Sequence, residues 1–265
     1  MLSTKSSHIK KLYKNSKWKP ILIQLIKKII RCIDSDIEKI IEINLNDKKI
    51  VEQLSIITAS SEAYSTQGNI NKAFRKWNTI KPNITTSING ILDFGGGVGD
   101  AAFAIGREIL KLPIDRTYVI DVDEFGGIQY EPRPDITFIH YDKKENLNKP
   151  VDLIMISHVM HHIDNKLYPE IIEFFNKILS SNGIIMLYEH ECNHDNIVPI
   201  INLEHCLYDV AVTKKMKYDK FVDTFYAKYL SIKKWESVFG KYFTPFNTIK
   251  LNNVDNSFYM FFKKL

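Results

Sequence analysis

The sequence predicts an α/β protein: a doubly wound, mostly parallel seven-stranded sheet that ends in an antiparallel hairpin and carries a helical N-terminal cap. Three observations predict this fold. From Ser87 onward, apolar strand-like runs alternate with amphipathic helical runs, as in a parallel sheet covered on both faces. A glycine-rich turn joins the first strand to the first helix in ILDFGGGVGDAAFAIGREI, Ile91 to Ile109. The chain closes with two strand-like runs separated by the turn-rich NNVDN.

Helical periodicity dominates residues 1–80, which we expect to form an extension or cap. From Pro20, apolar residues recur at helical spacing as far as Ile33, with basic residues between them, and two further helical patterns follow, the last from Val51 to Tyr64. A basic amphipathic helix can bind a membrane surface or RNA, but such an apolar stripe more often faces a protein core. Residues 81–265 are expected to form the main domain.

The expected strands are short apolar runs bounded by turn residues. They cover Gly90 to Phe94, Tyr118 to Val122, Ile136 to Tyr141, Val151 to Ser157 and Gly183 to Glu189. The expected helices between and after them cover Asp100 to Leu110, Tyr168 to Leu179, Asn196 to Val212, Tyr218 to Tyr229 and a short run after Ser231. Asn182-Gly183 is predicted to stop the helix that begins at Tyr168. The closing hairpin is expected to pair Phe246 to Leu251 with Ser257 to Phe262.

Composition and charge exclude several classes of protein. Apolar residues make up 45% of the 265 and charged residues 25%, as in a globular protein, and no apolar run approaches the roughly 18 residues of a membrane span. The three cysteines lack CxxC spacing, so neither a disulfide framework nor a structural zinc site is indicated, and the cytoplasm is the expected location. A mitochondrial presequence stays open, because basic residues precede the first acid, Asp34. The net charge of +5 would favour a polyanionic partner, but lysine is spread along the whole chain.

The glycine turn predicts an unusual kind of nucleotide site. It reads Asp93-x-Gly95-x-Gly97-x-Gly99, and an acid, Asp100, stands where a dinucleotide fingerprint needs a further glycine. The Gly-Lys-Ser/Thr of a phosphate-binding P-loop is also absent. Backbone amides at a helix N-terminus suit phosphate, yet here carboxylates flank them. A ligand with an adenosine, a cationic head and no phosphate fits this pattern, and S-adenosylmethionine (SAM) is such a ligand.

With this acid and these alternating glycines, the sequence resembles the class I SAM-dependent methyltransferases over about Ser87 to Leu265. The resemblance implies that SAM is the cofactor. It places Asp121, at the end of the second strand, at the ribose hydroxyls with Val122 beside it, although Asp123 is a rival for that role. Further cofactor-binding positions implied by the resemblance are Asp142 near the adenine, and Ser157 and His158 after the fourth strand. Asn182-Gly183 departs mildly from the family's L-x-P-G-G turn.

Candidate catalytic residues cluster after the fourth and fifth strands, where open α/β sheets bind ligands. His158, His161 and His162 would share a face of a helix, and His161 or His162 could act as the base. In this family such a pair also contacts the cofactor or caps a local helix. Glu189 and His190 open the polar segment YEHECNHDN and are expected to handle the substrate. That segment contains metal-binding residue types, including His194 and Asp195, but lacks zinc spacing, so no metal is predicted.

Absent motifs narrow the choice of methyl acceptor. No [DNS]-P-P-[YFW] follows the fourth strand, no Pro-Cys occurs, and Ser157 stands where a ribose 2′-O methyltransferase needs an acid. We favour RNA or an RNA cap, because the basic lead and the region EHECNHD…LEHCLYD resemble methyltransferases of large DNA viruses, several of which act on RNA. Tyr226 and Trp235 could stack on bases, although their spacing is more typical of a core. The alternatives are a metabolite methyltransferase, which HVMHH resembles, and a silent methyltransferase-fold binding subunit.

Overall fold

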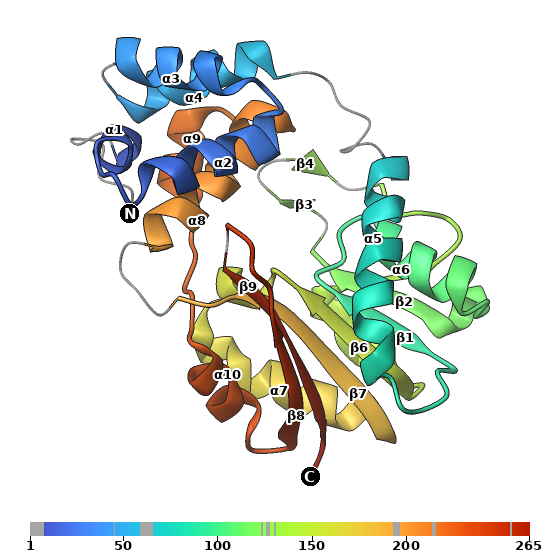
Figure 1. Ribbon diagram of the computed structural model, residues 1–265. Helices are drawn as coiled ribbons and strands as arrows, with labels where there is room; N and C mark the ends of the chain where they lie inside the picture. Colours follow the sequence, from blue (N-terminus) through green and yellow to red (C-terminus); the bar gives the residue numbers. More distant parts are fainter. Residues whose placement is uncertain are drawn as a thin grey trace.

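The computed structural model describes residues 8–44, 46–58, 66–122, 124–125, 128–129, 131–192, 197–213, 216–254 and 256–265. A seven-stranded sheet lies at the centre of its lower half in Figure 1, with helices on both faces. A group of helices drawn in blue and orange lies above the sheet. Asp123, His194 and Asp195 lie outside the described residues.

The sheet has the strand order β5-β2-β1-β6-β7-β9-β8. Neighbouring strands are parallel from β5 to β7, and β9 is antiparallel to both β7 and β8. The strands are β1 (Ile91–Phe94), β2 (Thr117–Asp121), β5 (Thr137–His140), β6 (Val151–Ser157), β7 (Leu179–His190), β8 (Phe243–Lys250) and β9 (Ser257–Lys264). The predicted fold class, a mostly parallel seven-stranded sheet with a closing antiparallel hairpin, is confirmed. A separate two-stranded ribbon, β3 (Glu124–Phe125) with β4 (Ile128–Gln129), was not predicted.

The central strands are apolar because both faces of the sheet are covered. Along β6, Ile154 and Ile156 contact the cluster under α7 (Tyr168–Ile178) and α10 (Ile232–Phe239). Leu153 and Met155 contact the opposite cluster, to which α5 (Thr66–Ile80) and the helix after the glycine turn contribute. That helix begins as α6 (Asp100–Ala102) and continues in π-helical turns, Phe103–Ile109. The strand order reverses between β1 and β6, so their carboxyl ends flank the position where such sheets bind ligands.

A second apolar core joins two distant parts of the chain. Residues of α1 (His8–Tyr13), α2 (Lys19–Ile30), α3 (Asp34–Ile43) and α4 (Asp47–Ile57) pack with α8 (Ile197–Cys206), its π-helical continuation Leu207–Val212, and α9 (Tyr218–Thr224). We call these helices the helical layer; they form the upper part of Figure 1. Its C-terminal members lie in the connection between β7 and β8, whereas α5 packs on the sheet. The division at residue 80 stays a prediction. Among the described helices, none is both long and apolar enough to cross a membrane.

Several predicted element boundaries were wrong, among them two helix ends. The helix from Tyr168 ends at Ile178, because Leu179 already pairs with Val151, and Asn182-Gly183 lies where the β6–β7 register shifts. The helix from Tyr218 ends at Thr224 rather than Tyr229, since the backbone beyond it bonds to the segment after β6 instead. The helical pattern predicted from Val51 to Tyr64 includes the last part of α4, which ends at Ile57; the predicted end, Tyr64, lies outside the described residues.

Candidate functional site

The glycine turn holds two glycines with different roles. Gly95 (φ +73°) donates its amide to the Ile120 carbonyl at 2.8 Å, and a Cβ on Gly95 would lie 2.3 Å from a Val159 methyl. Gly97 (φ +56°) also has the left-handed backbone that glycine adopts without strain. A Cβ on Gly97 would meet no heavy atom of the described structure within 4 Å. Gly95 is therefore required for packing, whereas Gly97 borders space that a ligand can enter.

Two carboxylates contact the turn from the protein side. A Cβ on Gly96 would lie 2.7 Å from Oδ2 of Asp93, a side chain only 4% exposed. Asp121 Oδ2 accepts a hydrogen bond from the Gly97 amide at 2.6 Å, and its Oδ1 accepts one from the amide of Val122, an exposed residue, at 2.7 Å. A phosphate would need such amides for itself and would be repelled by both acids. The turn therefore suits a ligand that brings hydroxyl donors or positive charge.

Asp100, the other acid beside the glycines, has a structural role. Its Oδ1 lies 3.5 Å from Nη1 of Arg133, and its Oδ2 accepts a hydrogen bond from Asn69 at 3.0 Å. These contacts join the first turn of α6 to α5 and to the segment before β5. Of the two acids that flank the glycines in the sequence, Asp93 is therefore the one that remains for a ligand.

A lysine that the sequence did not single out completes this part of the site. Lys76, on α5, donates a hydrogen bond to Ser157 Oγ at 3.0 Å, and its Nζ lies 5.1 Å from the centroid of the Tyr188 ring. Burial raises the pKa of Asp93 to about 7, against the opposing effect of the Lys76 charge, and Asp121 raises it further. Burial lowers the pKa of Lys76, and Asp93 counters that effect. The charges of an acid and a base thus influence each other beside the glycine turn.

The remaining predicted cofactor residues lie at the carboxyl ends of their strands. Ser157 ends β6, and His158 follows it with a left-handed backbone, φ +54°. Such a conformation is uncommon for a residue with a Cβ and is often found at functional sites. Asp142 follows β5; its side chain is 71% exposed, and its Oδ1 lies 3.2 Å from Nδ1 of His140. Asp142 is therefore accessible to a ligand at this edge.

Beyond the cofactor side, the fold gathers a cluster of histidines. His161 is fully buried, and its Nδ1 lies 2.5 Å from Oε2 of Glu189. The His158 ring stacks on Tyr188 and on His190, with centroids 4.1 and 4.2 Å apart. His162 bonds through Nδ1 to the Tyr226 carbonyl at 2.8 Å. The four predicted catalytic residues, His161, His162, Glu189 and His190, thus belong to one cluster.

The predicted reason for that grouping was wrong. His158, His161 and His162 do not share a helix face, because only Met160–His162 forms a short turn and His158 has a left-handed backbone. Two members of the cluster were not predicted from the sequence. His205 comes from α8, with its ring centroid 5.2 Å from that of His161, and Tyr229 lies at 5.1 Å from the same ring. The one available signal for His205 was its place in LEHCLYD.

Burial sets the protonation of the cluster. It holds the pKa values of His158, His161 and His205 well below the usual range of histidine, and neighbouring histidines add to the effect. Burial also raises the pKa of Glu189 to about 7, against the opposing effect of His190 and His162. The rings of His158, His161 and His205 are therefore neutral at pH 7, and a neutral imidazole has a lone pair that can accept a hydrogen bond or bind a metal ion.

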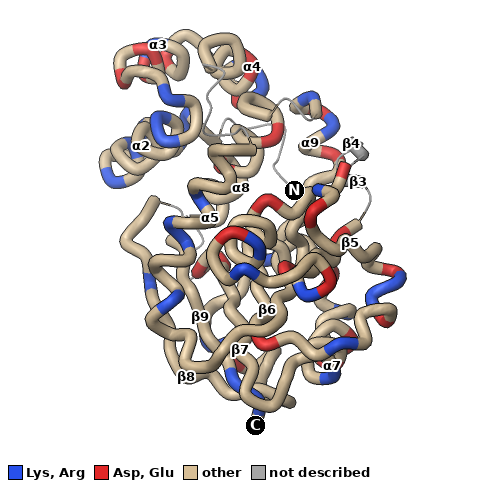
Figure 2. The backbone as a smooth tube through the Cα atoms, turned by 90° about the vertical axis from the view of Figure 1, so that its right-hand side faces the viewer, with Lys and Arg blue, Asp and Glu red and all other residues tan. Residues whose placement is uncertain are grey.

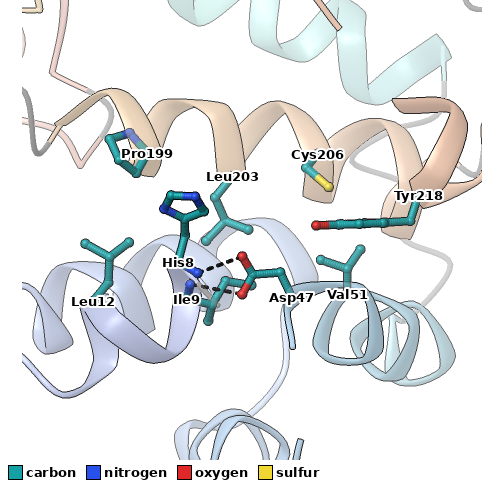
Figure 3. Close-up of a pocket in the computed structure, with 9 residues that line it drawn as sticks. All are labelled: His8, Ile9, Leu12, Asp47, Val51, Pro199, Leu203, Cys206 and Tyr218. Carbon is teal, nitrogen blue, oxygen red and sulfur yellow. Dashed lines mark hydrogen bonds between the residues drawn. The ribbon is translucent and has the colours of Figure 1, made fainter. Parts of the chain in front are cut away.

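A small pocket lies elsewhere, inside the helical layer (Figure 3). Asp47 lines this pocket, and its carboxylate accepts hydrogen bonds from the amides of His8 and Ile9 at 2.9 and 3.1 Å. These bonds satisfy the first turn of α1, as an N-cap would. The rest of its lining is mainly apolar side chains, among them Leu203 and Cys206 of α8. This pocket is explained by helix packing.

Known proteins resemble this chain in structure but not in sequence. No protein-family model and no curated protein sequence matches the chain. A SAM-dependent methyltransferase from Archaeoglobus fulgidus superposes with a TM-score of 0.51 at 13% identity, over 76% of this chain and 97% of that one. A protein from Pyrococcus horikoshii superposes with a TM-score of 0.50 at 13% identity, over 77% of this chain and 96% of that one. Human N-acetylserotonin methyltransferase in complex with SAM gives 0.45 at 14% identity; the match covers 77% of this chain but only 57% of the human chain. The Archaeoglobus match, like the strand order, shows the class I methyltransferase fold.

Proposed function

We propose that this chain, which has the fold of class I SAM-dependent methyltransferases, binds SAM and transfers its methyl group to a small-molecule acceptor. The observation that carries the proposal is the hydrogen bond from the Gly97 amide to Asp121. It commits an amide of the glycine turn to a carboxylate, where a nucleotide-binding turn would offer that amide to phosphate. SAM has ribose hydroxyls and a cationic head but no phosphate, so it matches these acids.

The cofactor-binding roles follow from the geometry of the turn. Asp121, with Val122 beside it, is proposed to accept hydrogen bonds from the two ribose hydroxyls. Gly97 leaves room for the adenosyl group. The amino-acid end of SAM carries an ammonium and a carboxylate, which we assign to Asp93 and Lys76 respectively. Gly95 and Gly99 shape the turn.

The other proposed cofactor contacts lie on neighbouring strand ends. Asp142 is assigned to the adenine amino group, because it is exposed at the end of the strand next to β2. Ser157 and His158 line the side of the site where Lys76 lies. From His158 a continuous line of ring contacts runs through His190 to His205, with 4.2 and 5.7 Å between successive centroids. The acceptor is therefore proposed to bind on the side of the site that is formed by these histidines, which we call the histidine side.

The histidine side supplies what methyl transfer requires of the protein. A sulfonium methyl is already reactive, so the main task is to hold the acceptor atom in line with the breaking methyl–sulfur bond. A protonated acceptor also needs a base. We assign that base to His190, because it stacks directly on His158 at the edge of the cofactor side. Glu189 then positions His161, and His161 with His162 forms the far wall.

A small acceptor fits this site better than the RNA we favoured from sequence. Lysines of the basic helix α2 are engaged within the helical layer: Lys27 with Asp34 at 3.0 Å and Lys28 with Glu204 at 3.4 Å. Figure 2 shows acidic and basic segments interspersed along the chain. Trp235 is fully buried and cannot stack on a base. Glu189 and His190, each 1% exposed, are too enclosed to contact a polymer. The free cysteines fit the cytoplasm, which remains our proposed compartment.

The experiment is a transfer assay with methyl-labelled SAM and an extract separated into small-molecule, RNA and protein fractions. We expect label in the small-molecule fraction with the wild-type chain and much less with Asp121→Ala at a SAM concentration near the wild-type dissociation constant. Label confined to RNA would overturn the small-molecule acceptor. Cofactor binding without transfer to any fraction would instead identify the silent binding subunit.

A further inference from the structure

We propose that His161, His162 and His205 bind a divalent transition-metal ion, with Zn²⁺ as the expected ion. One ring nitrogen from each of these histidines lies within 4.8 Å of the corresponding nitrogens of the other two. Zinc bound at about 2.0–2.1 Å to each of three imidazoles places tetrahedral nitrogens roughly 3.3 Å apart. Rotations of the three side chains that bring these nitrogens from at most 4.8 Å to roughly 3.3 Å apart would complete the site. Three histidines with one open position form a common zinc site.

The hydrogen bonds of two of these rings set which nitrogen faces the ion. Nδ1 of His161 bonds to the Glu189 carboxylate at 2.5 Å, and Nδ1 of His162 bonds to the Tyr226 carbonyl at 2.8 Å. The Tyr226 carbonyl can only accept, so His162 carries its proton on Nδ1. An ionised Glu189 holds the proton of His161 on Nδ1 in the same way. Nε2 is then the unprotonated nitrogen of each ring. A carboxylate or carbonyl behind a ligating histidine is the usual outer shell of a metal site, because it fixes the tautomer and the direction of the ring.

Among the three proposed ligands, two ring nitrogens lack the hydrogen-bond partners that buried polar atoms need, as does Nε2 of the neighbouring His158 within the described residues. Nε2 of His161 and Nε2 of His205 are inaccessible to solvent, and neither has a hydrogen-bond partner in the described part of the chain. Most buried polar side-chain atoms in proteins are hydrogen-bonded, so two such nitrogens in one cluster call for a ligand. A single metal ion satisfies both.

The chemistry of the surrounding side chains favours a transition-metal cation. The buried Glu189, 1% exposed, places a carboxyl group directly behind His161, with Oε2 2.5 Å from Nδ1. Imidazole ligands favour zinc, copper, iron and nickel over magnesium and calcium, which prefer oxygen.

The location gives the ion a chemical role that rests on the proposed function. The three histidines lie together on the proposed acceptor side of the site, and His205 brings the helical layer into it. The open position of a zinc ion can bind a hydroxyl oxygen and lower the pKa of that hydroxyl. The inferred acceptor is then a small molecule with an oxygen that can bind the ion. Metal binding itself does not depend on methyl transfer.

The test uses the full chain without a polyhistidine tag, stripped of metal by a chelator and then titrated with Co²⁺ and Zn²⁺. We expect one ion per chain, with a visible Co²⁺ spectrum typical of four-coordinate nitrogen sites, and displacement of Co²⁺ by Zn²⁺. His205→Ala and His162→Ala should weaken binding by more than the roughly tenfold to hundredfold loss that an outer-shell change causes. Glu189→Gln should fall within that smaller range. His8→Ala, a histidine in the pocket of the helical layer, is the matched control and should bind as the wild type does.

The outcomes separate this inference from the proposed function. Absence of stoichiometric binding to the wild-type chain overturns the metal site and leaves SAM binding to its own calorimetric test. Unchanged affinity in folded His205→Ala and His162→Ala, checked by circular dichroism, also overturns it. Metal binding with no affinity for SAM would support the site and contradict the methyltransferase.

Discussion

Asp121 accepts a hydrogen bond from the backbone amide of Gly97, with 2.6 Å between Oδ2 and N. The two residues lie on different strand–helix connections, since Asp121 ends β2 and Gly97 follows β1. The bond directs an amide of the turn toward a carboxylate. It thereby explains why acids lie beside a glycine-rich turn at a helix N-terminus, where phosphate groups more commonly bind.

Replacement of Asp121 by alanine should weaken SAM binding by roughly tenfold to hundredfold, as expected when hydrogen bonds to a charged group are lost. The reason is that the ribose hydroxyls lose their acceptor. Isothermal titration calorimetry measures the change. Asp115→Ala is the matched control, because Asp115 pairs with Lys149 on the surface. Equal affinities for both variants would remove Asp121 from the site.

The two glycines predict opposite results for one added methyl group. Gly97→Ala should leave the chain folded, with a loss of about 1 kcal/mol for the left-handed backbone, but should block the ligand. Gly95→Ala should lower the melting temperature strongly, since its Cβ would lie 2.3 Å from Val159. Thermal unfolding with and without SAM separates the effects. A Gly97→Ala variant that is stabilised by SAM as much as the wild type would contradict the assigned position of the cofactor.

Lys76→Met should lower the affinity for SAM and for S-adenosylhomocysteine by about tenfold, because the charge-assisted hydrogen bond to the ligand's carboxylate is lost. Affinity for methylthioadenosine, which lacks the amino-acid end, should not change. Lys81→Met, an exposed lysine just after α5, serves as the control. A loss of the same size for all three ligands would show that Lys76 supports the fold of the site and does not bind the carboxylate.

The affinity for SAM should fall with decreasing pH, because burial raises the pKa of Asp93 to about 7. Below pH 7 the cationic ligand must displace a proton from Asp93, which costs about tenfold in affinity per pH unit. Calorimetry between about pH 5.5 and 7.5 avoids deprotonation of the ligand's own amino group. Asp93→Asn should bind weakly, with little dependence on pH. A steep pH dependence that persists in Asp93→Asn would assign the proton to another group.

The same shift affects the stability of the protein without ligand. The pKa of Asp93 is higher in the folded than in the unfolded chain, so the folded state holds more protons between the ordinary carboxyl value and about pH 7. Stability should therefore fall as the pH rises through this window, and this part of the fall should be absent in Asp93→Asn. Urea unfolding at several pH values measures the difference.

The sequence predicted those features that depend on local pattern. Strands buried on both faces appear as apolar runs, and the glycines of the turn mark a backbone that few other residues adopt. Lys76 and His205 could not be found in this way. Each looks like any other residue of its helix, and only the packing of α5 on the sheet and of α8 above it brings them to the site. The end of α7 was misplaced because pairing of Leu179 with Val151 overrides the turn signal of Asn182-Gly183.

The central claim is that a positively charged, phosphate-free adenosyl ligand binds beside Gly97, Asp93 and Asp121. The most direct measurement is a calorimetric titration of the wild-type chain with SAM, and in parallel with ADP and NAD⁺. We predict binding of SAM in the micromolar range, about −8 kcal/mol, and no detectable heat with ADP or NAD⁺. Tight binding of either phosphate-bearing nucleotide, or no binding of SAM, would contradict the account.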